Sequence, residues 1–553
     1  MNRAFRAGHL ISAAFLAVLS TGIAAASTAD VNGMPLCTAA NDQILPVTVS
    51  DGAGGIIVVW LDGRPPTPGV IYGQRVDAAG VPQWAADGVQ LSTTADTGTP
   101  VIDPDGAGGV FIAFGGRFSP PRAQRVNASG VPQWGADGIP VTNDVSSTRE
   151  LAIAPDIGGT GGAFVAWRHD NGAGGNPDVH AQKLNSSGAL QWGQGIAITS
   201  SNMNSEGNPA VVSDGVGGAH FVWIGGAGVR WQRYDGSGNA LSNPLVLAAT
   251  GNNIPPSIVS DGGGGAIVAW SGGGAFIQRI TQAGDRIWGV MNAGLTLSTS
   301  GRAPTLIGDA PAGAIVTWED NRGGSNFNIF AQRVNSSGTA QWQPDGAEVC
   351  VETADQRAPK IVSDGNGGAI ISWFDARMSG FSGTDIYAQR LNGSGASQWL
   401  PTPTGVGVAI CTAPNNQVDP TMASDGSGGA WIAWQDRRSG TNEDIYAARV
   451  NPDGALVSVP LEQVPGWKTW PNPFSDRVVM SFVLPAAARV RTKVYNVDGR
   501  VVADLGSASL SEGPHRITWD GRTSEGRQLG GGVYFIHVEG SGFSLSRSVV
   551  RLK

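Results

Sequence analysis

The sequence predicts an all-β protein, an eight-bladed β-propeller followed by a small antiparallel β-sandwich. Three observations carry this prediction. A tandem repeat recurs about every 53 residues, a period typical of propeller blades. Glycine occupies 82 of 553 positions without a Gly-X-Y period, which excludes collagen. No stretch shows sustained helical periodicity. Because charged residues make up only 14% of the chain and hydrophobic residues 41%, most of it should bury a core.

The first residues are typical of a secretory signal peptide. Arg3 and Arg6 form a positive region, Leu10–Leu19 an apolar region, and Ala24–Ala26 a small-residue cleavage site. We therefore expect residues 1–26 to be removed and the mature chain to be secreted or attached to the outer surface. No later apolar run approaches the roughly 20 residues of a membrane-spanning helix, so we expect no transmembrane segment in the mature chain.

The repeat is a Ser-Asp-Gly-x-Gly-Gly turn followed by an apolar run that ends in an aromatic residue. The eight copies end at Trp60, Phe114, Trp167, Trp223, Trp270, Trp318, Trp373 and Trp434. Each copy continues with an Ile-Tyr-x-Gln-Arg-Val type segment, and six of the eight copies then have Gln-Trp or a close variant of it, with the tryptophan at 84, 134, 192, 288, 342 or 399. We expect four strands per copy: the run before the turn, the apolar run, the Tyr-x-Gln-Arg segment and the Gln-Trp segment. A lone four-stranded sheet cannot cover both its faces, so the copies should stack and close into a ring.

The two ends of the repeat region indicate how the ring closes. The segment Gly33–Thr38 matches Gly346–Cys350 and Val408–Thr412, which follow complete copies, whereas the last copy ends at Leu456 without Gln-Trp. An N-terminal segment docked on the last copy would close the ring, either as a ladder strand or only as a connector.

The same register decides the state of the cysteines. Cys37, Cys350 and Cys411 occupy one repeat position in three copies that are neighbours in the ring. Equivalent points on neighbouring blades should lie beyond the roughly 7 Å Cα separation that a disulfide allows. We therefore expect three buried free thiols.

The repeat stops after Leu456, and residues 459–466 are typical of a linker. Five strand-like runs follow and predict the sandwich. They are Val478–Leu484, Val490–Asn496, His515–Trp519, Val533–Val538 and Leu545–Leu552. We therefore assign residues 27–458 to the propeller and residues 467–553 to the sandwich.

Five motifs occur in order along this tail. They are Trp470–Phe474, Val494–Arg500, Trp519–Gly521, Gly532–Phe535 and Ser548–Lys553. Together they resemble the C-terminal sorting domain of type IX secretion substrates, which is similar to the immunoglobulin-like domain of flagellar hook-capping proteins. The resemblance gives the sorting role to Pro471, Asn472, Pro473, Gly499, Gly532, Tyr534, Arg551 and Lys553. It implies passage across the outer membrane, with the type IX secretion machinery as the partner that reads the tail. An accessory sandwich without a targeting role is the alternative.

Nothing in the sequence nominates a catalytic residue, a metal site or a cofactor. The histidines outside the leader, at positions 169, 180, 220, 515 and 537, lack the paired spacing of a zinc site. A phosphate-binding P-loop and a Gly-x-Ser-x-Gly elbow are both missing. The repeated turn offers one carboxylate per copy, fewer oxygens than calcium takes, so we assign its aspartate to the hairpin. The net charge of −8 argues against a nucleic-acid partner.

A Trp-x-Asp-x-Arg motif distinguishes copies one, six, seven and eight, which are contiguous in a closed ring. It supplies Asp62 and Arg64, Asp320 and Arg322, Asp375 and Arg377, and Asp436 and Arg438. A longer loop follows the motif in these copies. One interpretation is a partly exposed ion pair that ties down the loop, worth roughly 0–1 kcal/mol. The other is a ligand-binding arc, since loops on a rigid scaffold commonly carry recognition.

Two classes of function follow from this arc. The first is a secreted or surface-displayed binding protein whose propeller engages a glycan or protein ligand. The second is an extracellular hydrolase or lyase acting on polysaccharide, which would need a cleft with carboxylates unique to single copies. Residues that recur in all eight copies maintain the blade, because one active site needs one of each. The pattern therefore favours binding over catalysis.

Overall fold

The computed structural model describes residues 32–457 and 468–552, apart from short segments at 96–97, 117–119, 145–147, 171–174, 200–204, 227, 250–253, 290–292, 381–382, 400–406, 471, 473, 475–476, 485–487, 498, 511–512 and 541–542. The predicted signal peptide (1–26) and linker (459–466) lie outside the described residues. All regular elements in the described part of the chain are β-strands, which confirms the all-β class. No helix capable of spanning a membrane occurs there.

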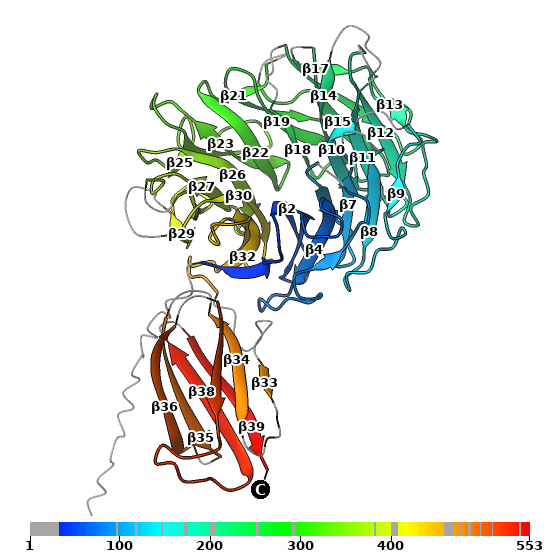
Figure 1. Ribbon diagram of the computed structural model, residues 1–553. Coiled ribbons are helices and arrows are strands. Elements are labelled where there is room, and N and C mark those ends of the chain that lie inside the picture. Colours follow the sequence, from blue (N-terminus) through cyan, green and yellow to red (C-terminus); the bar gives the residue numbers. More distant parts are fainter. Residues whose placement is uncertain are drawn as a thin grey trace, which may run out of the picture.

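Residues 34–450, as far as they are described, form eight four-stranded antiparallel sheets, one for each copy of the repeat (Figure 1). We number these sheets 1–8 in chain order. Sheet 1 contains β2 (Gln43–Ser50), β3 (Ile56–Asp62), β4 (Val70–Val76) and β5 (Val89–Gln90), and sheet 2 contains β6 (Val101–Pro104), β7 (Val110–Phe114), β8 (Arg122–Val126) and β9 (Ile139–Pro140). Sheet 3 contains β10 (Thr148–Pro155), β11 (Ala163–His169), β12 (Asp178–Leu184) and β13 (Ile196–Ala197), and sheet 4 contains β14 (Glu206–Ser213), β15 (Ala219–Gly225), β16 (Gly228–Tyr234) and β17 (Leu245–Ala248). Sheet 5 contains β18 (Ser257–Ser260), β19 (Ala266–Ser271), β20 (Ala275–Ile280) and β21 (Leu295–Ser298), and sheet 6 contains β22 (Gly301–Asp309), β23 (Gly313–Asp320), β24 (Asn328–Val334) and β25 (Ala347–Cys350). Sheet 7 contains β26 (Gln356–Ser363), β27 (Ala369–Asp375), β28 (Asp385–Leu391) and β29 (Val408–Cys411), and sheet 8 contains β30 (Gln417–Ser424), β31 (Ala430–Asp436), β32 (Asp444–Val450) and β1 (Met34–Cys37).

The eight sheets stand side by side around a common axis, as Figure 1 shows. The first strand of each sheet packs beside the first strand of the next, in the order β2, β6, β10, β14, β18, β22, β26 and β30, and β30 packs beside β2 again. Apolar side chains fill the space between neighbouring sheets, as where Trp434 and Ile432 of sheet 8 meet Ile370 and Ile386 of sheet 7. Stacking therefore removes from water the apolar faces that a single sheet would expose.

The N-terminal segment closes the ring as a ladder strand. β1 pairs antiparallel with β32, with Met34 opposite Ala447 and Cys37 opposite Ile445. Leu36 and Cys37 lie in one buried cluster with tryptophans of sheets 1 and 8. The predicted docking of this segment on the last copy is confirmed, and of the two forms left open it is the ladder strand.

The prediction that Gln-Trp forms the outermost strand is wrong. In sheet 7 that strand is β29, and Gln398 and Trp399 precede it. The ladder stops early because the backbone N–H of Trp399 donates to the side-chain Oε1 of Gln389 (3.0 Å) rather than to a backbone carbonyl. Trp399 instead packs between sheets 7 and 8, where its indole N–H donates to the carbonyl of Pro452 (3.0 Å).

The repeated aspartate forms the hairpin as expected, and it also joins neighbouring sheets. In sheet 1, Oδ1 of Asp51 accepts the N–H groups of Ala53 and Gly55, each at 2.8 Å. Its Oδ2 accepts Nε of Arg75 (3.0 Å), and Arg75 donates onward to the carbonyl of Ala128 in sheet 2 (3.2 Å). We call this aspartate–cation pair the hairpin staple. It recurs in all eight sheets, with lysine replacing arginine in sheet 3.

The tail forms two further antiparallel sheets that share one core. One contains β33 (Lys468–Trp470), β34 (Val478–Leu484) and β37 (Gly513–Trp519), and the other contains β36 (Val501–Leu510), β35 (Ala488–Asn496), β38 (Gly532–Gly540) and β39 (Phe543–Arg551). Met480 and Trp519 of the first sheet pack against Val494 and Ile536 of the second. The five predicted runs are all strands, whereas β33 and β36 were not predicted.

Candidate functional site

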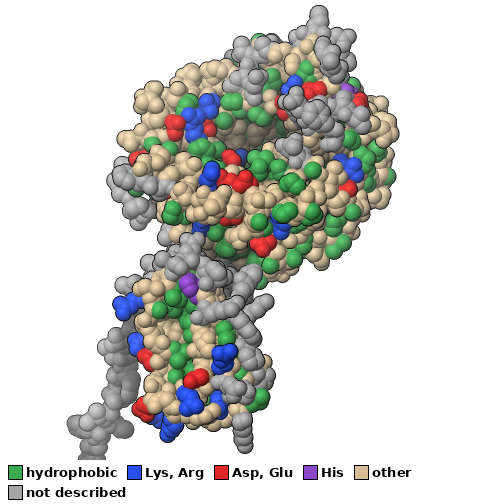
Figure 2. Space-filling model, in the orientation of Figure 1, with side chains coloured by type: hydrophobic (Ala, Val, Ile, Leu, Met, Phe, Trp, Pro, Cys, Tyr) green, Lys and Arg blue, Asp and Glu red, His purple; other side chains and the backbone are tan. Residues whose placement is uncertain are grey.

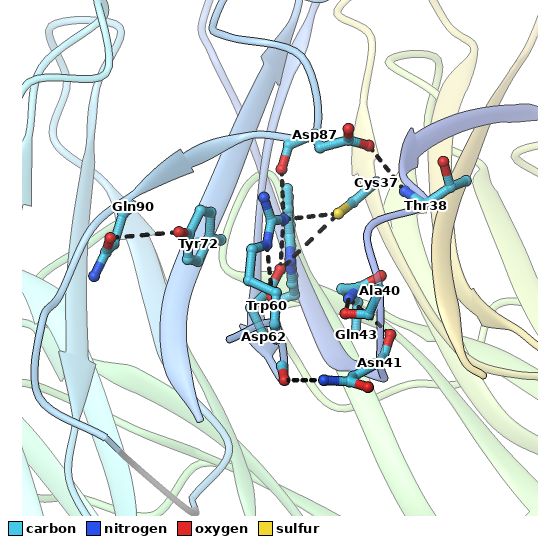
Figure 3. A network of polar contacts seen from close by, with 12 residues as sticks. Cys37, Thr38, Ala40, Asn41, Gln43, Trp60, Asp62, Tyr72, Asp87 and Gln90 are labelled. Atoms are coloured by element: carbon cyan, nitrogen blue, oxygen red, sulfur yellow. Dashed lines mark hydrogen bonds and ion pairs between the residues drawn. The ribbon is translucent and has the colours of Figure 1, made fainter. Parts of the chain in front are cut away.

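The Trp-x-Asp-x-Arg motif forms a closed network at the end of the second strand of sheet 1 (Figure 3). Oδ2 of the fully buried Asp62 accepts the indole N–H of Trp60 (2.8 Å). Its Oδ1 accepts the backbone N–H (2.9 Å) and Nε (2.8 Å) of Arg64, whose guanidinium lies 4.0 Å above the ring centre of Tyr72. Both carboxylate oxygens are therefore engaged within their own loop.

The same arginine reaches the preceding sheet in the ring. Nη2 of Arg64 donates to Sγ of Cys37 (2.9 Å), which lies on β1 of sheet 8. The equivalent contacts in sheets 7, 8 and 6 are Arg377 to Cys350 (3.2 Å), Arg438 to Cys411 (3.3 Å) and Arg322 to the hydroxyl of Ser298 (3.5 Å). We call this network of tryptophan, aspartate, arginine and cysteine or serine the latch. The three cysteines are free and buried, which confirms their prediction.

In sheet 6 the latch is an ion pair at neutral pH. Burial alone would raise the pKa of Asp320, but hydrogen bonds from Arg322, Ser298 and Trp318 outweigh it and lower that pKa to about 2. Burial raises the pKa of Cys37 and Cys411 to about 12, so these thiols stay neutral and accept from the guanidinium. The arginine side chains range from 32% exposed at Arg322 to 3% at Arg438. The pair is thus more buried than the sequence interpretation assumed.

A second network, which the sequence analysis missed, connects the loops to one another. Oδ1 of Asp42 accepts the N–H of Glu443 (3.0 Å), and the N–H of Gln43 donates to the carbonyl of Glu443 (2.8 Å). The carbonyl of Asp42 in turn accepts the N–H of Gly63 (2.7 Å). Asp42 therefore ties the loop of sheet 8 to the loop of sheet 1. We call this arrangement the clasp.

The clasp recurs at the two preceding junctions of the ring. Between sheets 6 and 7, Asp355 accepts from Phe327 (2.9 Å), Gln356 donates to Phe327 (2.7 Å) and Ala376 donates to Asp355 (2.9 Å). Between sheets 7 and 8, Asn416 accepts from Thr384 (3.1 Å), Gln417 donates to Thr384 (2.7 Å) and Arg437 donates to Asn416 (2.9 Å). The signal was present in the sequence, since an Asp-Gln or Asn-Gln pair ends six residues after each of the three cysteines.

Latches and clasps together produce one continuous surface, which we call the rim. It comprises the loops 63–69, 321–327, 376–380 with 383–384, and 437–443, and the connecting segments 38–42, 351–355 and 412–416. Exposed on it are Asn41, Asn415, Thr441 and Arg437, and Met378 is 42% exposed. The structure thus brings the four predicted Asp–Arg pairs into one arc, with the carboxylates inside and the loops outside.

Charged side chains on the rim and directly beside it are paired with one another. At the junction of sheets 6 and 7, Phe327 lies between the guanidinium groups of Arg302 and Arg357, at 4.6 and 4.0 Å. Arg302 pairs with Glu319 (2.9 Å), and Arg357 pairs with Asp355 (2.9 Å). Figure 2 likewise shows acidic and basic side chains mixed in small groups on the face it presents. The rim therefore offers hydrogen-bonding groups without a patch of one charge.

The other four sheets lack the latch. Gly116, His169, Gly225 and Gly272 occupy the position of its aspartate in sheets 2–5. His169 lies against His180, with ring centres 4.5 Å apart and the rings tilted by 35°, and burial, with the nearby His169, lowers the pKa of His180 to about 4. No group of side chains suited to holding a metal ion is found in the described part of the chain.

The residues of the predicted sorting motif hold the tail together. Asn472 donates to the carbonyl of Ser548 (3.1 Å) and accepts the N–H of Val550 (2.8 Å). The hydroxyl of Tyr534 donates to Gly530 (2.9 Å), and Arg551 donates to the carbonyl of Leu529. Gly499 takes a positive φ of 74° in a turn, and Gly532 begins β38. Pro471, Pro473 and Lys553 lie outside the described residues.

Comparison with known proteins finds a family model that matches part of the tail. The model of the FlgD Ig-like domain family matches residues 474–542. No curated protein matches the chain. Among solved structures, the BP39L lectin from Burkholderia pseudomallei is 13% identical, with a TM-score of 0.46 over 65% of this chain and 98% of that chain. PorZ, a surface component of the type IX secretion system of Porphyromonas gingivalis, is 14% identical, with a TM-score of 0.29 over 92% and 70%. The α-L-arabinanase of Penicillium chrysogenum is 12% identical, with a TM-score of 0.34 over 52% and 92%.

The chain is therefore an all-β protein of eight four-stranded sheets in a ring, with a C-terminal segment similar to the FlgD Ig-like domain.

Proposed function

We propose that the chain is a secreted or surface-displayed binding protein whose eight sheets are the blades of a β-propeller and whose rim engages a glycan. The observation that carries this proposal is the continuity of the rim, in which latches and clasps join four loops. Amide, hydroxyl and guanidinium groups, which are suited to sugar hydroxyls, lie on its outer side. A surface fixed before binding loses less conformational entropy when the ligand arrives.

The predicted site residues divide into two roles in this proposal. Asp62, Asp320, Asp375 and Asp436 position the loops, because their carboxylates are buried and engaged. Arg64, Arg322 and Arg377 keep 15–32% of their side chains exposed and contact the ligand. Arg438, at 3% exposed, only positions its loop.

An extracellular polysaccharide hydrolase or lyase is the second candidate, and one observation favours it. Asp444 faces Asp436 across neighbouring strands, and burial, with the charge of Asp436, raises the pKa of Asp444 to about 7. A carboxyl group with a raised pKa close to a second carboxyl group is an arrangement that glycoside hydrolysis uses. However, Asp375 and Asp385 repeat this pairing in sheet 7, and all four residues are buried. A repeated, buried pair fits a structural role better than a single active site.

The experiment that tests the proposal screens the mature protein on a polysaccharide panel for binding and for released reducing ends. We expect saturable binding without turnover. The double variant Asp375→Ala, Asp436→Ala should lose capture, because two adjacent rim loops lose their latches. Asp261→Ala, which removes a hairpin staple in sheet 5, is the control for lowered stability. Turnover abolished by Asp444→Asn would establish the enzyme instead, and capture unchanged in the double variant would contradict the proposed site.

For export, we propose a signal peptide at 1–26, a propeller at 27–458, a linker at 459–466 and a sorting domain at 467–553 that the type IX machinery reads. The family match at residues 474–542 and the five tail motifs support this assignment. We expect residues 467–553 fused to a periplasmic reporter to carry it to the surface of a type IX-competent bacterium. A reporter that stays in the periplasm would leave the tail as an accessory domain.

A further inference from the structure

The three clasps lie at consecutive junctions, between sheets 6 and 7, 7 and 8, and 8 and 1. We infer that the rim binds a linear glycan of repeating, uncharged sugar units, which lies along the arc and meets these junctions in succession. This inference rests on the proposed function and adds the class of ligand and its direction.

The three junctions are equivalent. Each is built from an Asp or Asn that accepts from the preceding loop, followed by a glutamine whose N–H donates back to that loop. Gln43, Gln356 and Gln417 are all 0% exposed. A surface that repeats the same parts from blade to blade is matched by a ligand that repeats as well.

An unused hydrogen-bond acceptor lies under each junction. The Oε1 atoms of Gln43, Gln356 and Gln417 have no hydrogen-bond partner among the described residues. A buried acceptor left unpaired costs about 1–3 kcal/mol, and a bridging water can satisfy it. The same free acceptor therefore lies beneath three neighbouring exposed segments, where a hydroxyl-bearing ligand would complete a water-mediated contact.

The charge of the rim favours a neutral glycan over an acidic one. Each of its five arginines already pairs with a carboxylate, at 2.6–2.7 Å in the four latches and at 3.6 Å between Arg437 and Glu443. A uronate or sulfate polymer would need a free guanidinium to compensate its charge. The rim provides none among the described residues, so an uncharged, hydroxyl-rich polymer fits it.

A ligand that occupies successive junctions gains affinity. When one unit of a chain is bound, the next unit meets its junction at a high effective concentration, so affinity rises steeply without any new kind of contact. Independent monosaccharide sites would give no such gain. Dependence of affinity on chain length is therefore the property that identifies this mode of binding.

The test is calorimetric titration of the mature protein with neutral cello-, xylo- and manno-oligosaccharides of two to eight units, and with polygalacturonate. For one of the neutral series we expect affinity to rise in steps, by about 10²-fold or more over the series, at one long chain per protein and with little change between 0.05 and 0.5 M NaCl. Equal affinity for short and long members would overturn this inference and leave glycan binding intact. Tighter, salt-sensitive binding of polygalacturonate would also overturn it. Failure of every glycan in the panel would instead remove the proposed function.

Single-junction variants sharpen the result. Asn415→Gly deletes an exposed amide at the middle junction. Asn41→Gly deletes one at an end junction, together with its hydrogen bond to the carbonyl of Gly63 (3.0 Å). Both asparagines have positive φ (65° and 67°), which glycine adopts without strain. We expect the middle variant to weaken long chains by at least tenfold, and the end variant to shorten by one step the length at which affinity saturates. Asn143→Gly replaces an exposed asparagine between sheets 2 and 3, outside the rim; it is the control and should leave glycan affinity unchanged. Equal losses in both rim variants, with unchanged saturating length, would mean separate sites and contradict a continuous chain.

Discussion

The two faces of the ring use the same pair of residue types for different ends. On the hairpin face, an aspartate–cation staple recurs in all eight sheets and connects neighbouring sheets. On the rim face, an aspartate–arginine latch occurs in four adjacent sheets, and clasps join three of their junctions. A feature that every sheet repeats maintains the fold, whereas a feature confined to one arc marks a place where the sheets do something further. The chemistry of the pair is the same on both faces. Its distribution around the ring therefore indicates whether it maintains the fold or belongs to the candidate site.

The largest expected effect comes from removing the closing strand, because the seam of the ring lies inside the latched arc. Deleting residues 27–37 exposes the edge of β32 and removes the buried side chains of Leu36 and Cys37. We expect at least about 5 kcal/mol lower unfolding free energy and aggregation through the open edge, measured by urea denaturation and light scattering. Ile196→Ala, on the outermost strand of sheet 3, is the matched change in the opposite arc and should cost less. An unchanged midpoint in the deletion would mean that the seam does not close the ring.

The next effect compares a latch directly with a staple. Asp436→Ala leaves the guanidinium of Arg438, 3% exposed, without its partner, and should cost about 3–5 kcal/mol. Asp261→Ala also frees an arginine, but Arg279 is 20% exposed and can turn to water, so about 1–3 kcal/mol is expected. Urea denaturation of both variants measures the difference. A costlier staple than latch would reverse the ranking of the two faces.

Most of the ring was predictable from the sequence because its signals are local and repeated eightfold. Asp51 and its glycines announce a hairpin, and the spacing of the tryptophans gives the period. The outermost strand was misassigned because the ladder ends where the side chain of Gln389 takes over a backbone hydrogen bond, and nothing in the local pattern of Gln398 and Trp399 distinguishes that from a strand. Asp42 and its clasp were missed because its partner, Glu443, is about 400 positions away and only the closed ring brings them together.

Two carboxyl groups, one in the latched arc and one outside it, should make the stability of the fold depend on pH. Burial, with the charge of Asp436, raises the pKa of Asp444 to about 7, and burial alone raises that of Asp103 in sheet 2 to about 7. A carboxyl group whose folded-state pKa is raised stabilises the fold below its ordinary pKa, and this stabilisation is lost as pH rises through the folded-state value. Relative to the parent, Asp444→Asn and Asp103→Asn should therefore gain stability progressively between pH 4 and pH 8 in thermal unfolding.

A further variant distinguishes the two groups. In an Asp436→Asn background, the pH dependence removed by Asp444→Asn should shrink, because a like charge has gone, while the effect of Asp103→Asn should stay the same. A constant difference between Asp444→Asn and its parent at every pH would show that Asp444 does not titrate in this range.

The smallest expected effect lies within the latch itself. The latch of sheet 6 already has a serine, Ser298 of the neighbouring sheet 5, where the other latches have cysteine, and its hydroxyl donates to Asp320 at 2.6 Å. Cys350→Ser should therefore change the unfolding free energy by less than about 1 kcal/mol, since serine supplies the same acceptor to Arg377. Burial raises the pKa of the Cys350 thiol, so the parent should react with a thiol reagent only after unfolding, at three groups per chain, and the variant at two. A loss of several kcal/mol would mean that sulfur is needed for its size, and that the latch in sheet 6 is built differently from the other three.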